Sequence, residues 1–394
     1  MVNDQSRMER LQHKMLQQQI DACLVSQNVD LFYFCGSMQT GYLFIPAQGE
    51  ASFYVRRSLT RAKDESSVTT DSLGSFRSFG ERLRHDYPSL FCGLQKPVIC
   101  TEFDVLPVQI FRKLEEVIPH AQWVDGSLLI RETRMIKSQF EISKIKEAAE
   151  AVNIALEQAL AQIKAGMTEL ELISLIEHAL RIQGHLGIMR MRGYNQEIIT
   201  GMVGSGRAAA MPTYFDGPAG GEGLSAASPQ GAGRKQIERD EPILIDIGCC
   251  IDGYVIDQTR TVCIGKLPED LTRAYDLSEE ILRNTEHKLK PGTVCEDIYL
   301  EAYELAKIFG LSANFMGYGE DQVKFLGHGI GLEIDELPIL AKGFKTPLEP
   351  GMVIAIEPKF SFPGRGVVGI ENTYVITDSG FDKLTFSREG IIRV

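Results

Sequence analysis

The sequence predicts two domains, an α/β domain followed by a larger α+β domain. The chain has 394 residues, which is more than one ordinary core requires. Short apolar runs alternate with helical or polar stretches through about residue 130, and this alternation is typical of an α/β domain. From Pro242 onward, β-rich segments separated by Gly and Pro follow a helical region, so the second domain is predicted to be α+β.

The first domain is expected to cover residues 1–134. An amphipathic helix is predicted over residues 8–23, and short apolar runs that can form strands follow it: ACLV, YLFIP, SFYV and PVIC. A basic stretch after Val124 then leads into a long helix, in which apolar residues recur at intervals of three and four. We therefore place the start of the second domain at residue 135 and its end at residue 394.

Several elements of the second domain have local signals. Thr168 and Glu171 form a capping-box pattern, and Gly184 is the expected stop of that helix. Further helices are predicted at about 269–289 and 296–309. Strands are predicted for the segments ILIDIG, YVIDQTRTVCI, MVIAIEP and VVGIENTYVIT.

One segment, residues 213–233, is rich in Gly, Ala, Ser and Pro and is expected to be a loop. No GK[ST] follows its glycines, so a phosphate-binding loop is excluded. The loop is interpreted either as a mobile surface segment or as a lid that covers a substrate.

Composition narrows the class of protein. A formal charge of −12 argues against nucleic acid as the main partner, because phosphate binding depends on Lys and Arg, and an excess of acid fits cation binding better. No apolar run approaches the roughly 18 residues of a membrane span, and the first residues lack the apolar core of a signal peptide. We expect a cytoplasmic protein whose eight cysteines are reduced.

Two strands of the second domain are predicted to bring a pair of aspartates together. If ILIDIG and YVIDQTRTV pair as a hairpin about the midpoint of Ile251 and Asp252, Asp246 and Asp257 lie opposite each other, roughly 5 Å apart at Cβ. Two carboxylates at that separation repel each other unless a proton or a cation lies between them.

A second hairpin repeats this arrangement. A turn centred on Gly364 places Glu357 opposite Glu371, again within apolar strands where an uncompensated acid is costly to bury. Two divalent cations would compensate the four carboxylates, and His328, with glycine on both sides, is the natural fifth ligand. An oxygen-rich site with one imidazole suits manganese, iron, cobalt or zinc. The predicted metal ligands are Asp246, Asp257, His328, Glu357 and Glu371.

At these residues the sequence resembles the creatinase, prolidase and aminopeptidase P superfamily, which includes methionine aminopeptidase. The matching motifs, in order, are LIDIGCCIDGYVIDQTRT, GHGIGLEIDELP, AIEP and GIENTYVIT. The similarity continues in the opening segment ERLQHKMLQQQIDACLVSQNVDLFYFCG and in the junction RMIKSQFEISKIKEAAE. The resemblance implies a pita-bread metallohydrolase fold for residues 135–394 and a creatinase-type N-terminal domain for residues 1–134.

The resemblance also implies roles for the ligands. Asp257 and Glu371 would bridge two metal ions, Asp246 would complete one coordination shell, and His328 with Glu357 would complete the other. Manganese is the leading candidate, with cobalt, zinc and iron as alternatives. A water shared by the metals would attack a carbonyl, with Glu357 handling the proton. A homodimer is implied as well.

The sequence departs from the peptidases of this superfamily at three positions. A substrate-handling histidine that usually follows a proline is replaced by Gln230, a histidine seven residues after the metal-binding one is replaced by Asp335, and an arginine two residues before the last glutamate is replaced by Gly369. Gln230 can still donate a hydrogen bond to a substrate oxygen. Asp335 can accept a proton or bind a cationic group, or it is simply an exposed acid. Four other residues are considered as substitutes for the missing groups: His185, Arg190, Arg192 and Lys324.

Three functions follow from this site. The first is a hydrolase with two metal ions that cleaves an Xaa-Pro or similar amide in a small peptide, with Glu357, Asp335 and Gln230 as candidate catalytic residues. The second is a metal-dependent hydrolase or lyase for a small non-peptide molecule, which the altered residues Gln230 and Asp335 favour. The third, disfavoured by the complete ligand set, is a binding protein without catalysis.

Overall fold

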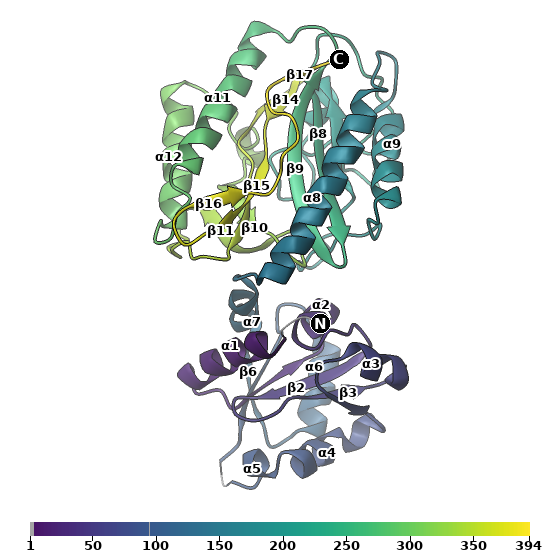
Figure 1. Ribbon diagram of the computed structural model, residues 1–394, viewed down its shortest axis with the longest axis vertical. Coiled ribbons are helices and arrows are strands. Elements are labelled where there is room, and N and C mark those ends of the chain that lie inside the picture. The colour runs from purple at the N-terminus through teal and green to yellow at the C-terminus, as the bar shows by residue number, and fades with distance from the viewer. Residues whose placement is uncertain (1–3, 94) are drawn as a thin grey trace. The chain divides into compact units, whose positions relative to one another are not determined.

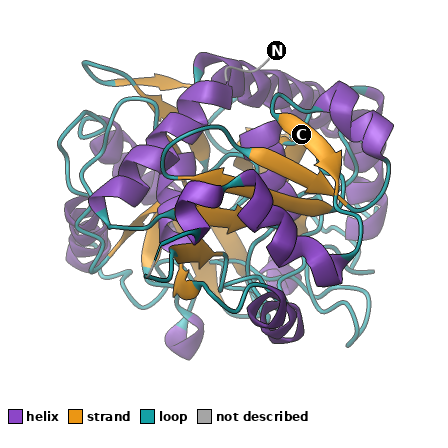
Figure 2. Cartoon of the chain, turned by 90° about the horizontal axis from the view of Figure 1, so that it is seen from below, coloured by secondary structure: helices purple, strands orange, loops and turns teal. Residues whose placement is uncertain are grey.

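The computed structural model describes residues 4–93 and 95–394 and divides the chain into two compact units. The first unit holds the residues up to Arg134 and the short segment Arg192–Tyr194, and the second holds Met135–Met191 and Asn195–Val394. Figure 2 shows the helices and strands of the chain, and both kinds of element occur in each unit. Within the described ranges, no helix is both long enough and apolar enough to cross a membrane.

The first unit is built on one six-stranded sheet with the order β4-β3-β2-β1-β5-β6 (Figure 1). The central strand β1 pairs antiparallel with β2 and parallel with β5. The strands are β1 (Ala22–Val25), β2 (Gly41–Pro46), β3 (Ser52–Val55), β4 (Thr69–Ser72), β5 (Val98–Thr101) and β6 (Gln122–Asp125). The helices are α1 (Asp4–Gln17), α2 (Asn28–Cys35), α3 (Leu59–Glu65), η1 (Phe76–Ser78), α4 (Phe79–Asp86), α5 (Pro88–Phe91), α6 (Val108–Val117) and α7 (Ser127–Arg134).

The expected helix over residues 8–23 is wrong at its C-terminal end. The helix ends at Gln17, and Ala22–Val25 forms β1, whose side chains are all buried. The apolar run ACLV suits a central strand better than a helix end. β1 has a hydrogen-bonded neighbour on each side, and its side chains are buried within the unit.

The second unit combines three sheets with four long helices and two short ones among the described residues. The sheet orders are β17-β9-β8-β7, β11-β10-β12-β15-β16 and β13-β14. Its strands are β7 (Gly201–Ser205), β8 (Ile243–Ile251), β9 (Tyr254–Cys263), β10 (Phe325–Gly329), β11 (Glu336–Ala341), β12 (Val353–Ile356), β13 (Lys359–Phe362), β14 (Gly366–Gly369), β15 (Asn372–Ile376), β16 (Phe381–Lys383) and β17 (Ile392–Arg393).

Its helices are α8 (Gln139–Leu160), α9 (Glu169–Ile182), α10 (Gly206–Ala209), α11 (Glu269–Glu286), α12 (Cys295–Ile308) and η2 (Gly319–Asp321). Helix α8 packs on β8 and β9, and α11 and α12 lie on the opposite side of the strands (Figure 1). The capping box at Thr168 and Glu171 is present, as expected. The strands β8 and β9, which carry Asp246 and Asp257, therefore lie between two helical layers.

The β8–β9 hairpin differs from the predicted register. Ile251 pairs with Tyr254, and the two turn residues Asp252 and Gly253 both have positive φ, 50° and 95°. Asp246 is therefore opposite Thr259 rather than Asp257, which is opposite Gly248. The prediction was wrong by two residues because an Asp-Gly pair forms a tight two-residue turn. A shift of two keeps both aspartates on one face, as diagonal neighbours.

The second predicted hairpin has the expected register. β12 pairs with β15 from Val353↔Val375 to Ile356↔Asn372, and β13 continues the same register against β14 from Lys359↔Gly369. Glu357 and Glu371 lie at the break between these two ladders, where the shared register sets them opposite each other. At this break, Glu357 and Glu371 do not pair with each other in either ladder.

Candidate metal centre

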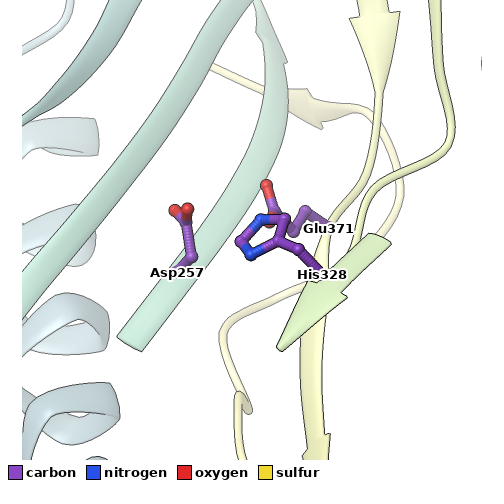
Figure 3. A group of neighbouring side chains, drawn as sticks. All are labelled: Asp257, His328 and Glu371. Carbon is purple, nitrogen blue, oxygen red and sulfur yellow. The ribbon is translucent and has the colours of Figure 1, made fainter. Parts of the chain in front are cut away.

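The five side chains expected to bind metal lie in two groups that share Glu371. One group is Asp257, His328 and Glu371, and the other is Asp246, Glu357 and Glu371. Within each group, one possible ligand atom from each residue lies within 4.8 Å of the others. Figure 3 shows the first group, whose side chains come from β9, β10 and the residue before β15.

The family resemblance implies that Glu357 and His328 bind the same ion. Glu357 is grouped with Asp246, and its Oε1 also lies 3.8 Å from His328 Nε2. A cation contacts the other carboxylate oxygen of Glu357.

That cation is Lys359, which was not among the residues expected at the site. Its Nζ donates hydrogen bonds to Glu357 Oε2 at 2.6 Å, Asp246 Oδ2 at 2.9 Å and Glu371 Oε2 at 3.1 Å. Lys359 is fully buried. A signal for it was present in the sequence, because a residue two positions after Glu357 in an extended segment points to the same face.

Glu371 is fixed by its neighbours on β9. Thr259 Oγ1 donates to Glu371 Oε2 at 2.7 Å, and the buried guanidinium of Arg260 donates to the Glu371 carbonyl oxygen at 2.8 Å. The same guanidinium donates to the carbonyl oxygens of Arg388 at 2.7 Å and Ser387 at 3.0 Å. Glu371 Oε1 is buried and has no hydrogen-bond partner among the described residues.

Asp335 lies beside the histidine of the first group. Its Oδ1 is 3.2 Å from His328 Nδ1, which is also 3.1 Å from the Gly329 carbonyl oxygen. The hydrogen bond to the Gly329 carbonyl oxygen, with the negative charge of Asp335 close by, favours the tautomer that carries its proton at Nδ1 and leaves the Nε2 lone pair for a metal. The Asp335 carboxylate therefore lies beside His328, on the side of the ring opposite the candidate metal-binding nitrogen.

The electrostatics of the cluster show a shortage of positive charge around Asp257. Burial raises the pKa of Asp257 well above its usual value, and the nearby charges of Glu371 and Asp246 add to this. Burial also raises the pKa of Glu357 to about 7, although Lys359 opposes the change. Burial would raise the pKa of Glu371 too, but Lys359 and His328 hold it below its usual value. A cation near Asp257 would relieve this repulsion.

A pocket of about 70 Å³ opens onto this cluster. Its wall includes four of the expected ligands and, on another side, residues 215–219 of the Gly-rich loop. Gln230 and Asp335 also line it. The apolar part of the lining consists of Met189, Ile198, Ile199, Met202, Phe325 and Ile334 with Phe215. The loop thus contributes directly to the site. A second cavity of about 590 Å³ borders residues 209–220, which include the start of the loop.

The four substitutes considered for the missing histidines are not among the described residues that line this pocket. His185 is buried, and its Nδ1 accepts a hydrogen bond from the Cys250 backbone at 2.9 Å. Arg192 binds Asp30 and Asp104 of the first unit. Arg190 and Lys324 also lie outside the pocket wall.

The geometry agrees with comparisons to known protein families. Residues 143–378 match the model of metallopeptidase family M24, and residues 7–136 match that of the creatinase/prolidase N-terminal domain.

Individual proteins give the same result. A Xaa-Pro dipeptidase of Pyrococcus furiosus is 29% identical over 96% of this chain and 97% of its own length. Among solved structures, a Xaa-Pro dipeptidase from Bacillus anthracis superposes with a TM-score of 0.84 at 26% identity, covering all of both chains. The prolidase from Pyrococcus horikoshii OT3 gives 0.80 at 26% identity, covering 98% of this chain and 100% of its own. These similarities confirm the pita-bread architecture of the second unit and the creatinase-type first unit.

Proposed function

Because the chain belongs to metallopeptidase family M24, we propose that it hydrolyses an amide bond in small peptides of the Xaa-Pro type. The observation that carries this proposal is the convergence of Asp257, His328 and Glu371. Asp257 and His328 line the pocket, and Glu371 Oε1 is buried behind them without a hydrogen-bond partner among the described residues. A divalent ion held there would supply a Lewis acid for the scissile carbonyl and would acidify a water molecule.

The protein's own groups have distinct tasks in such a reaction. Glu357 lines the pocket, so its carboxylate lies where it can take a proton from an attacking water molecule and return it to the leaving group. Gln230 can donate a hydrogen bond to a substrate oxygen. Asp335, which the sequence left open as a proton carrier, is assigned to orienting His328.

We propose that residues 215–219 act as a lid. The pocket of about 70 Å³ is small beside ligand sites of roughly 300–1,000 Å³. A peptide can therefore enter only if one wall of the pocket moves. Residues 215–219 form neither helix nor strand, so this wall is the one expected to move. Closure of the loop would exclude water from the reaction.

The acidity of the pocket favours a second candidate function. In it, the protein is a hydrolase or a lyase that acts on a small cationic molecule that is not a peptide. Five acids line the pocket, and none of its described lining residues is Arg or Lys. A free dipeptide would find no cationic side chain in that lining for its carboxylate. A substrate with an amine or guanidine group would be attracted instead. The acids are Asp216, Asp246, Asp257, Asp335 and Glu357.

Substrate panels separate the two candidates. The chain, loaded with Mn(II), Co(II) or Zn(II), would be tested on Xaa-Pro dipeptides, on the same dipeptides as C-terminal amides, and on small cationic amides. H328A is the control for metal dependence. Turnover of proline peptides that is lost in H328A supports the first function. A metal-loaded protein that cleaves no proline peptide contradicts it and favours the second.

The identity of the metal, the homodimer and the cytoplasmic location stay predictions. Activity reconstituted metal by metal would test manganese, and light scattering on the purified chain would test the dimer.

A further inference from the structure

Three carboxylates surround the Lys359 ammonium, and they are the same three that form the second candidate metal group. The acceptors are Asp246, Glu357 and Glu371, at 2.9, 2.6 and 3.1 Å from Nζ. An ammonium has three N–H donors, so every donor of Lys359 is used. Lys359 is fully buried, and the contacts hold it in this position from three sides.

A metal ion and this ammonium cannot share the group. A divalent cation lies about 2.0–2.6 Å from its oxygen ligands, so an ion on these three oxygens would overlap Nζ. Two cations this close would also repel strongly in a buried site. The second group is therefore already neutralised in part by the protein itself.

The first group has no such occupant. Asp257 makes no hydrogen bond or ion pair with Lys359 in the described structure; its Oδ1 accepts only from the Gln258 backbone, at 2.9 Å. Glu371 divides its oxygens between the two groups, because Oε2 takes the bonds from Lys359 and Thr259, while Oε1 has no partner among the described residues. The His328 Nε2 lone pair is left free by the contacts at Nδ1.

We infer that this centre holds one divalent cation, bound by Asp257, His328 and Glu371, and that the Lys359 ammonium takes the place of the second cation. The inference rests on the metal centre of the proposed function but not on its substrate. It departs from the expectation of two ions, which was based on four carboxylates without a counter-charge and on the family resemblance. One divalent ion with Lys359 leaves the four carboxylates with a single uncompensated negative charge.

Metal stoichiometry tests this directly. The full chain would be stripped with a chelator, dialysed against Mn(II), and analysed for bound metal. Wild type should bind about one ion and K359G about two, because the glycine removes the competing cation and opens its place. K235M is the matched control, since Lys235 is a largely buried ammonium bound to Glu241 at 2.6 Å, away from the pocket wall. It should bind about one ion, as wild type does.

Wild type with about two bound ions, or with none, would overturn the inference, and so would a folded K359G that binds no more than wild type. If K359G does not fold, wild type still decides the question. Its Mn(II) electron paramagnetic resonance spectrum should be that of an isolated ion, and a spectrum of two coupled ions would contradict the inference. H328A should lose the ion. These readouts do not depend on turnover, so a chain that binds one ion but cleaves no peptide would refute only the proposed function.

Discussion

Lys359 and Gly369 face each other in the β13–β14 ladder, and a Cβ on Gly369 would lie only 2.6 Å from Lys359 Cγ. The same Cβ would lie 2.7 Å from the Pro358 carbonyl oxygen. The stem of the lysine therefore fills the space that a side chain at position 369 would need. Position 369 can therefore hold no side chain while Lys359 keeps its present position.

Substitution G369A should consequently destabilise the protein by about 1–3 kcal/mol, because the methyl group overpacks the ladder. The loss should be smaller in a K359G background, where the contact with Cγ disappears while those with the Pro358 carbonyl oxygen and the Cα of residue 359 stay. Urea denaturation of the four proteins in a double-mutant cycle measures this. G380A is the control, since a Cβ there meets no atom within 4 Å. Equal losses in both backgrounds would contradict the coupling.

The contact between Asp335 and His328 predicts a change in metal affinity. D335A should weaken Mn(II) binding by about 10- to 100-fold, because the imidazole loses the group that orients it. D335N keeps an oxygen that can accept from Nδ1 and should recover most of the affinity. Calorimetric titration with Mn(II) measures both. An unchanged affinity in D335A would show that the 46% exposed carboxylate has no influence on the ligand.

The loop over the pocket predicts a kinetic effect. F215A removes an apolar side chain from the wall and should raise KM about 10-fold, with the metal content unchanged. Y214A is the matched control, because Tyr214 borders only the larger cavity of the two. Steady-state kinetics with the best substrate measures the difference. Equal effects of the two substitutions would contradict a specific role for Phe215.

Acid sensitivity should depend on Glu389. Burial by itself would raise its pKa, but hydrogen bonds from Lys383 at 2.6 Å and Asn372 at 2.8 Å, with the charge of Arg283, hold the pKa at about 2. A pKa lowered by folding means that the carboxylate stabilises the protein above its unfolded value of about 4.3, and that this contribution is lost as pH falls towards 2.

Wild type should therefore be more stable than E389Q by about 2 kcal/mol at pH 6, and the difference should shrink steadily below about pH 4.3. Urea denaturation at a series of pH values measures the difference. A gap that stays constant down to pH 3 would show that the ionised carboxylate is not its source.

The strand pattern made much of the centre predictable. Apolar strands with acids at fixed positions indicated two hairpins, and the register through Glu357 and Glu371 was right. The register through Asp246 and Asp257 was wrong by two residues, although the Asp252-Gly253 pair is the common signature of a two-residue turn and would have corrected it. Both acids kept their face, because the error was an even number.

A spacing of two residues predicts that Lys359 shares a face with Glu357, but strand patterns miss the other contacts of Lys359. Its three partners come from β8 and from the break between two ladders, so no local spacing predicts that they meet at one nitrogen. The position of Asp335 beside His328 could not be predicted from the sequence either, because residues 330–335 form neither helix nor strand. Long-range convergence of side chains, rather than secondary structure, decides how many cations the site accepts.

The guanidinium of Arg260 joins the backbone of Glu371 to the carbonyl oxygens of Ser387 and Arg388. Arg260 thereby couples the 387–388 segment to the backbone of Glu371, a candidate metal ligand. A partner, a fused tag or a protease that displaced this segment would leave a buried guanidinium short of acceptors. The backbone of Glu371 would then lose part of its support, although no pocket residue had been changed.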